Sequence, residues 1–319
     1  MKRGFSFLTR LFCLALCLSL CACSPAPAKG AAAVHSVEMA LDMTPLANSP
    51  AVSGLILPEA SGETVFENES ALIDASNTRD GYVMIRAKKA GEKRLKVIVT
   101  TPDGTAYTYD LPRGSYTVFP LSGGNGGYTA AVYENAYETK YALLLDAKLT
   151  VKLKDEFAPF LTPNQFVRYD ENSKAVLLAK ELTKDMSDPL KKIEAVFHYV
   201  INNISYDHAL AKTVKSGYLP DLDALLVSKK GICFDYASLM AAMLRSQNIP
   251  AKLVVGYTGS IYHAWISAYT KESGWVEGVI FFDGAVWKLM DPTFLSSSAD
   301  EDMLRYVENA ANYSAKYLY

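Results

Sequence analysis

Hydrophobic and polar residues alternate along much of the chain between about residues 53 and 154. Within 147–154, Ala, Leu, Val and Leu alternate strictly with Lys, Thr, Lys and Lys, the pattern of a strand with one buried and one wet face. Segments 93–100 and 106–109 flank the turn formers Pro102, Asp103 and Gly104, which predicts a hairpin. Several short strands at this spacing predict an all-β, Ig-like sandwich over residues 51–158.

The hydrophobic period changes after about residue 159. Asp188 and Pro189 are suited to the start of a helix, and apolar residues at helical spacing follow as far as 204. A second helix is predicted over 232–247 and ends before Pro250. The pattern then predicts strands at 251–257, 263–269, 275–282 and 286–290 and a helix over 300–317. Helices followed by antiparallel strands predict an α+β catalytic domain over residues 159–319.

The first residues have the pattern of an export signal. Positive charges precede the apolar segment 11–20, which is too short to span a bilayer. The following sequence Leu20-Cys21-Ala22-Cys23 resembles the lipobox of bacterial lipoproteins. The resemblance implies a signal peptide over 1–22, a lipid on Cys23 and an extracytoplasmic protein anchored to the bacterial cell membrane. An ordinary cleaved signal is the alternative. Residues 23–50 begin with a stretch rich in Pro, Gly and Ala and are predicted to be a flexible tether.

The charge of the chain excludes one class of partner, and its cysteine content points to one candidate thiol. The formal net charge of −2 gives no basic surface for nucleic acid, so we expect no such partner. Five cysteines are present, three of them in the predicted leader. If Cys23 carries lipid, the exported protein keeps Cys233 as its one thiol and has no partner for a disulfide. The alternative is that this cysteine is buried and inert.

The neighbours of Cys233 favour a reactive thiol. It follows Gly231 at the predicted start of a helix, where backbone N–H groups and the helix dipole favour a thiolate. His263 opens one predicted strand and Asp291 ends a later one. Neighbouring antiparallel strands could bring these two side chains together, so that the carboxylate orients the imidazole as the general base for the thiol. We therefore predict a catalytic triad of Cys233, His263 and Asp291.

Three short motifs resemble those of the transglutaminase-like superfamily, which is related to papain-fold thiol enzymes. They are Gly231-Ile232-Cys233-Phe234-Asp235-Tyr236, His263-Ala264-Trp265 and Asp291-Pro292-Thr293. The similarity covers about residues 170–295. It implies an α+β papain-like fold and acyl transfer through a thioester on Cys233. The predicted sandwich lies outside these motifs and receives no function from them.

The second donor of an oxyanion hole is less clear from the sequence. The backbone N–H of Cys233 is a natural first donor, and Tyr206 is the candidate for the second, with a simple core tyrosine as its alternative. His208 is a rival base on a predicted loop. Asp235 is expected to be a first-turn helix residue with no catalytic part. The sequence contains no cluster of metal-ligand residues and no phosphate-binding loop, so no metal or cofactor is expected.

Three functions fit the sequence. The first is hydrolysis of a peptide or side-chain amide by a cell-surface thiol protease or amidase, whose substrate is a protein or a cell-wall peptide. The second is transfer of the acyl group to an amine, which cross-links proteins. The third is a surface binding module whose triad is vestigial. Water and amine cannot be told apart as acceptors from the sequence, because the choice depends on how dry the acyl pocket is.

Overall fold

We analysed a computed structural model of the chain, which describes residues 52–277, 280–282, 287–289 and 310–319. The predicted leader and tether, with Cys23, and the predicted triad member Asp291 lie outside the described residues. All described residues fall in one compact unit. The predicted boundary at 158/159 therefore stays a prediction.

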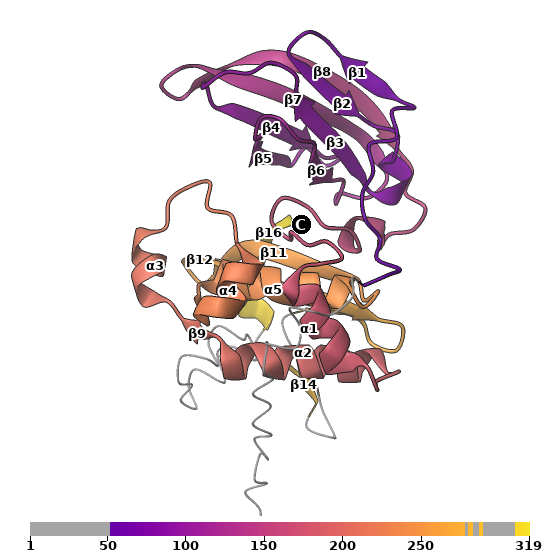
Figure 1. Ribbon diagram of the computed structural model, residues 1–319, viewed down its shortest axis with the longest axis vertical. Coiled ribbons are helices and arrows are strands. Elements are labelled where there is room, and N and C mark those ends of the chain that lie inside the picture. Colours follow the sequence, from indigo (N-terminus) through magenta and orange to yellow (C-terminus); the bar gives the residue numbers. More distant parts are fainter. Residues whose placement is uncertain (1–51, 278–279, 283–286, 290–309) are drawn as a thin grey trace, which may run out of the picture. The chain divides into compact units, whose positions relative to one another are not determined.

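Eight strands form two four-stranded antiparallel sheets in the first part of the described chain (Figure 1). The strand order of one sheet is β1 (Val65–Glu67), β2 (Ala71–Asp74), β3 (Tyr82–Ala87) and β6 (Thr117–Pro120). The order of the other is β5 (Ala106–Asp110), β4 (Leu95–Thr100), β7 (Gly126–Tyr137) and β8 (Lys140–Val151).

The alternating pattern has the expected physical cause. In β8 the side chains of Ala147, Leu149 and Val151 are buried, whereas Lys148 and Thr150 between them are exposed. The predicted hairpin joins β4 to β5. Its turn is closed by the Asp103 carboxylate, which accepts a hydrogen bond from the backbone N–H of Thr105 at 3.0 Å. The predicted strands are thus confirmed here. The chain changes sheet between β3 and β4, between β5 and β6 and again before β7, while assignment to the Ig-like class stays a prediction.

Five α-helices are described after residue 170. They are α1 (Lys174–Thr183), α2 (Pro189–Asn203), α3 (His208–Thr213), α4 (Leu222–Ser228) and α5 (Cys233–Arg245). The Asp188 carboxylate caps α2 by accepting a hydrogen bond from the N–H of Leu190 at 2.9 Å, as the sequence predicts. Three short 3₁₀ helices complete the helical segments: η2 (Thr78–Asp80), η3 (Ala158–Phe160) and η4 (Ala310–Asn312).

A third four-stranded sheet follows α5. Its strand order is β13 (Gly274–Glu277), β12 (Ile261–Thr270), β11 (Ala251–Thr258) and β16 (Tyr313–Leu318), and all its pairs are antiparallel. Two strand pairs are smaller: β9 (Ser205–Tyr206) with β10 (Lys230–Gly231), and β14 (Ile280–Phe282) with β15 (Trp287–Leu289). The predicted mixture of helices with antiparallel strands is confirmed.

The predicted terminal helix over 300–317 is wrong where the structure describes it. Residues 313–318 form strand β16, which pairs with β11. Backbone hydrogen bonds in both directions between Leu253 and Tyr319, each 2.9 Å, continue this pairing. The sheet partner decides the conformation, because alternate aromatic residues suit a strand that has a neighbour to pair with. Helix propensity alone could not reveal that neighbour.

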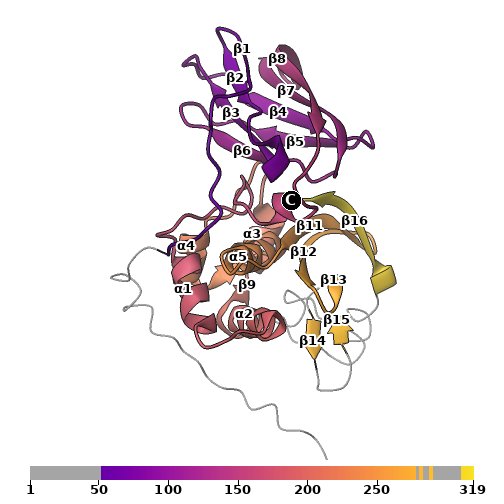
Figure 2. The same cartoon turned by 90° about the vertical axis from the view of Figure 1, so that its right-hand side faces the viewer.

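Helix α5 is the centre of this part of the molecule. Figure 2 shows it between α1 and the strands β11 and β12, and it contacts all three. Leu239, Met240, Met243 and Leu244 on α5 have no exposed surface. A helix apolar on nearly every side is expected where it is covered all round. Among the described residues, no helix combines the length and the apolarity needed to cross a membrane.

Candidate functional site

Cys233 is the first residue of α5, as the sequence predicts, and its thiol is free and half-buried. The turn before it depends on Gly231. A Cβ atom at this position would lie 2.7 Å from a methyl carbon of Leu225 and 2.8 Å from Cβ of Asp235. Only glycine fits there without displacing its neighbours, and this close packing presents the thiol at the end of the helix.

Asp235 fixes the start of α5. Its carboxylate accepts a hydrogen bond from the backbone N–H of Ile232 at 2.8 Å and another from the hydroxyl of Tyr218 at 2.7 Å. The side chain is buried, and burial raises the pKa of Asp235. The prediction that it is a first-turn residue is confirmed. The sequence analysis missed Tyr218, and the only signal for the arrangement is an acid at the third helical position, where it can bond back to the residue before the helix.

Tyr206 lies directly beside this turn. Strand β9 pairs in parallel with β10, which places Tyr206 opposite Gly231. The backbone N–H of Asp207 donates to the carbonyl of Gly231 at 2.8 Å, and the Tyr206 ring centroid lies 6.5 Å from that of Tyr236. Tyr206 is thus near the segment that leads to the thiol, where an oxyanion donor would be needed. Its role in an oxyanion hole stays a prediction.

The rival base His208 begins helix α3, not a loop. Its ring packs edge-on against that of Tyr206, with centroids 5.0 Å apart.

The C-terminal end of α5 is anchored by a buried arginine. The Arg245 guanidinium donates hydrogen bonds to the carbonyl oxygens of Thr162 at 2.7 Å, Ala251 at 2.7 and 2.9 Å, and Tyr319 at 2.6 Å. Burial lowers the pKa of Arg245 to about 10, so the side chain keeps its charge at neutral pH. Sequence reasoning missed this anchor, because two of its three acceptors, Thr162 and Tyr319, come from distant segments.

This anchor fixes where the thiol lies along the sheet. Arg245 binds the carbonyl of Ala251, which pairs with Ala268 at one end of the β11–β12 hairpin. Helix α5 has 13 residues and extends about 18 Å. The strand from Ala268 to Tyr262 covers about 20 Å. Since α5 packs on β12, the helix start with Cys233 reaches the end of the hairpin at which Tyr262 and His263 lie.

Electrostatics supports this placement. The pKa of Tyr262 is raised, first by burial and then by the charges of Tyr317, Tyr257 and Cys233. The thiol is therefore within electrostatic reach of Tyr262, whose side chain lies on the face of β12 opposite to that of His263.

His263 lies within β12 and is buried. It pairs with Gly256 of β11, and its ring is stacked on that of Trp265 with centroids 6.1 Å apart. Alternation along the strand puts His263 and Trp265 on one face, and Tyr262 with Ala264 on the other. The structure thus brings Cys233 and the strand that carries His263 to the same end of the sheet. The contact between thiol and imidazole stays a prediction, as does the part of Asp291, which lies outside the described residues.

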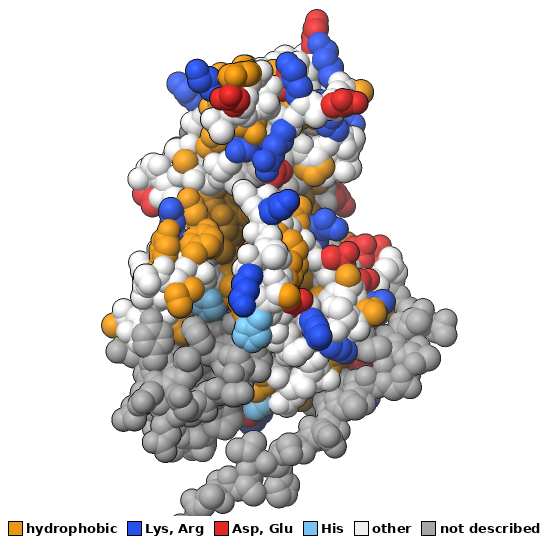
Figure 3. Space-filling model, turned by 90° about the vertical axis from the view of Figure 1, so that its left-hand side faces the viewer, with side chains coloured by type: hydrophobic (Ala, Val, Ile, Leu, Met, Phe, Trp, Pro, Cys, Tyr) orange, Lys and Arg blue, Asp and Glu red, His pale blue; other side chains and the backbone are white. Residues whose placement is uncertain are grey.

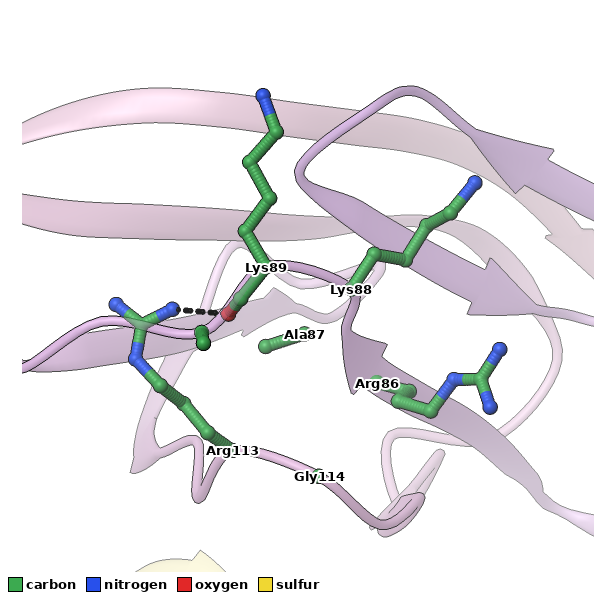
Figure 4. Close-up of a pocket in the computed structure, with 7 residues that line it drawn as sticks. Arg86, Ala87, Lys88, Lys89, Arg113 and Gly114 are labelled. Atoms are coloured by element: carbon green, nitrogen blue, oxygen red, sulfur yellow. Dashed lines mark hydrogen bonds between the residues drawn. The ribbon is translucent and has the colours of Figure 1, made fainter.

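A separate hollow of about 530 Å³ lies on the first sheet region and contains none of the candidate catalytic residues (Figure 4). Basic side chains line it, but three of the four are paired with acids. Lys88 pairs with Glu67 and Lys89 with Glu69, and Arg113 also donates to the carbonyl of Lys89 at 2.7 Å. Arg113 pairs with Glu134, and Arg86 lies over the Tyr116 ring. Within the described ranges, no group of three His, Cys, Asp or Glu side chains could hold a metal ion.

Comparisons with known proteins identify a family for part of the chain. A profile of the Transglutaminase-like superfamily matches residues 177–278. The uncharacterized protein YebA of Bacillus subtilis is 27% identical over 172 residues, which are 47% of this chain and 22% of YebA. A protein-glutamine gamma-glutamyltransferase of Pseudomonas aeruginosa is 27% identical over 161 residues. The match covers 46% of this chain and 22% of that protein. The chain thus spans about a fifth of the length of these two relatives.

A third relative is matched over more of its length. The uncharacterized protein ML0607 of Mycobacterium leprae is 25% identical over 228 residues, which are 67% of this chain and 76% of that protein.

Two solved structures share a weak likeness. A candidate cysteine protease from Cytophaga hutchinsonii has 16% identity and a TM-score of 0.37, with 80% of this chain and 73% of that one covered. Red sea bream transglutaminase has 11% identity and a TM-score of 0.31. The match covers 71% of this chain and 53% of that one. The family assignment rests on the sequence profile: residues 177–278, which contain Cys233, His263 and Tyr206, belong to the transglutaminase-like superfamily.

Proposed function

We propose that the protein is a thiol hydrolase that cleaves peptide or side-chain amides through a thioester on Cys233. The observation that carries the proposal is a free, half-buried thiol at the first residue of α5, at the hairpin end where His263 lies. Backbone N–H groups at a helix start favour a thiolate. Membership of residues 177–278 in a superfamily that includes thiol acyl-transfer enzymes supports it further.

The proposed reaction has two steps. His263 takes the proton from the Cys233 thiol, and Sγ attacks the amide carbonyl carbon to give a tetrahedral oxyanion. The C–N bond then breaks while the imidazolium returns its proton to the leaving amine, which leaves a thioester. Water attacks the thioester, His263 takes one proton from it, and the C–S bond breaks to release the carboxylic acid. In this proposal Asp291 orients the imidazole, and the hydroxyl of Tyr206 helps the Cys233 N–H to bind the oxyanion.

Transfer to an amine is the second candidate. The Pseudomonas aeruginosa relative, named a protein-glutamine gamma-glutamyltransferase, favours it. In that reaction a primary amine replaces water in the second step, and proteins become cross-linked. A binding module with a vestigial triad is the third candidate, and turnover of any amide would contradict it.

One experiment separates these three functions. The purified protein is incubated with a glutamine-containing peptide amide, with and without a dansylated primary amine, and its intact mass is followed with time. Hydrolysis predicts transient acylation of Cys233 and release of free acid even with the amine present. Dansyl-labelled peptide as the main product would favour transfer. No acylation and no product, with peptide binding retained, would favour the binding module.

The location is proposed from the sequence. We propose that Cys23 carries the lipid and that the enzyme acts outside the cytoplasm, on a protein or a cell-wall peptide. Metabolic labelling with an alkyne fatty acid tests this. Label should enter the wild-type protein and be lost in Cys23→Ser. Equal labelling of both would exclude the anchor.

A further inference from the structure

Two tyrosine side chains are exposed side by side on one face of the β11–β12 hairpin. Tyr257 is 39% exposed and Tyr262 57%, whereas Ile261, which is 61% exposed, lies on the opposite face of the strand. Single exposed apolar residues are common, but a cluster of them marks a surface that binds something. The turn between these residues consists of Thr258, Gly259 and Ser260, so the hairpin end carries no charged side chain.

The cluster is held in place by the strands. Tyr257 pairs with Tyr262 across the hairpin, and their rings pack edge to face with centroids 5.4 Å apart. Gly259 has a φ of 57°, which suits the tight turn between the two strands. The two rings therefore form a preformed surface, which would lose little side-chain freedom when an apolar group binds.

The two rings lie at the end of the hairpin that the start of α5 reaches. The geometry of α5 brings Cys233 to this end of the hairpin, and its charge reaches Tyr262. Phe234, the residue after the thiol, lies 5.5 Å from Phe166 between ring centroids.

Figure 3 shows hydrophobic side chains gathered around a hollow on the face that is the left-hand side of Figure 1, where β12 is labelled.

We propose that Tyr257 and Tyr262 form a subsite for an apolar or aromatic side chain of the acyl donor, next to the amide that Cys233 attacks. The proposal rests on the proposed function. It names the substrate class as peptide segments with an apolar residue beside the scissile amide. A charged residue at that position would lose its hydration against the two rings, with no opposite charge on the hairpin end to compensate.

A binding measurement tests the subsite without turnover. Fluorescein-labelled hexapeptide amides that differ only in one central residue, Phe, Leu, Asp or Lys, are titrated with the Cys233→Ala protein. We expect the Phe and Leu peptides to bind at least tenfold more tightly than the Asp and Lys peptides. Tyr262→Ser and Tyr257→Ser should each remove most of this preference. Equal affinity for all four peptides, or a preference that both variants retain, would overturn the proposal.

A matched control lies on another helix. Val227 of α4 is 70% exposed, so Val227→Ser removes a similar amount of exposed apolar surface elsewhere. It should leave the peptide preference unchanged. Sedimentation of the same proteins tests a different occupant. A dimer that Tyr262→Ser dissolves, with equal binding of all four peptides, would make the cluster a contact between two copies of the chain.

Turnover separates this proposal from the proposed function. In the wild-type protein, kcat/KM should be higher for the Phe peptide than for the Asp peptide, and Tyr262→Ser should lower it chiefly through KM. Alkylation of Cys233 by iodoacetamide should be unchanged in Tyr262→Ser, because the small reagent needs no subsite. Peptide preference in Cys233→Ala with no turnover by the wild type would contradict the proposed function and keep the subsite. Turnover by the wild type without any peptide preference in Cys233→Ala would contradict the subsite and keep the proposed function.

Discussion

The two ends of α5 are built in opposite ways. At the C-terminal end, Arg245 is buried and its guanidinium binds three backbone carbonyl groups from three segments. At the N-terminal end, Cys233 keeps a free thiol that is only half-buried. The polar group that holds this end is Asp235, and it binds the residue just before the thiol.

The two ends of the helix therefore have different roles: one anchors the helix, and the other carries the reactive group. A charge that is fully surrounded by hydrogen-bond partners fixes the helix and has little left to offer a ligand. A half-buried thiol on a helix start that another side chain fixes is positioned and yet accessible. We therefore expect changes at the two ends to affect different properties of the protein.

Cys233→Ala should have the largest effect, and on turnover alone. Loss of the nucleophile should lower kcat for a peptide amide by at least about 10⁴-fold. The free energy of unfolding should change by about 1 kcal/mol or less, because the change leaves only a small, half-open space. Amide turnover and thermal melts measure the two quantities. His263→Ala should give the same combination, and full activity in that variant would contradict the mechanism.

Arg245→Met should have the reverse effect, lowering the free energy of unfolding while turnover by the folded protein is kept. It removes the guanidinium donors from the buried oxygens of Thr162 and Ala251 and one of the two donors to Tyr319, which keeps the N–H of Leu253, so we expect a loss of about 3 to 5 kcal/mol in the free energy of unfolding. The folded fraction should keep its kcat within a few-fold. Urea unfolding and turnover at low temperature measure these. Arg94→Met is a matched control, since Arg94 is half-exposed beside Asp110 and its loss should cost about 1 kcal/mol or less. Equal losses in both variants would contradict the anchor.

Asp235→Asn should remove a pH dependence of the free energy of unfolding. Burial raises the pKa of Asp235, so the folded protein holds this proton more tightly than the unfolded chain does. The resulting stability is fully present below the unfolded pKa of about 3.8 and is lost as pH rises through the raised folded pKa. Relative to Asp235→Asn, the wild type should therefore lose stability over the pH range above 3.8. Urea midpoints measured across this range test the sign, and parallel curves would contradict it.

Asn248→Gly should have the smallest effect, just beyond the Arg245 end. Asn248 has a φ of 57°, a left-handed conformation in which glycine is more favourable than asparagine. We expect a gain of up to about 0.5 kcal/mol in the free energy of unfolding and unchanged turnover. Asn248→Val should lose about 1 kcal/mol, because a β-branched residue is strained at this φ. A loss of stability in Asn248→Gly would mean that the asparagine side chain has a structural role.

Local patterns in the sequence predicted local structure well. The start of α5 at Cys233, the cap of α2 by Asp188 and the alternation along β8 all depend on neighbours within one turn or one strand. These features could be predicted because the deciding contacts lie close in sequence.

Features set by distant partners could not be predicted. The segment 313–317 was expected to be helical and is a strand, because β11 supplies its hydrogen-bonding partners. Arg245 looks in the sequence like an ordinary residue of a last helical turn, and nothing there indicates acceptors at Thr162 and Tyr319. Tyr218 lies outside the motif that contains Asp235. The roles of Asp291 and Cys23 stay predictions, because both residues lie outside the described part of the chain.

The pairing of β11 with β16 has a consequence for the order of folding. The β11–β12 hairpin can close as soon as its own residues are available, whereas Gly256 must wait to pair with Ala315, far along the chain. Closing so long a loop is entropically costly and slow compared with forming a hairpin. The Tyr319 acceptor of Arg245 arrives with the same late strand. The anchor of α5 and the sheet on which it packs are therefore expected to become rigid late in folding. The reactive site should then form only after most of the chain has folded.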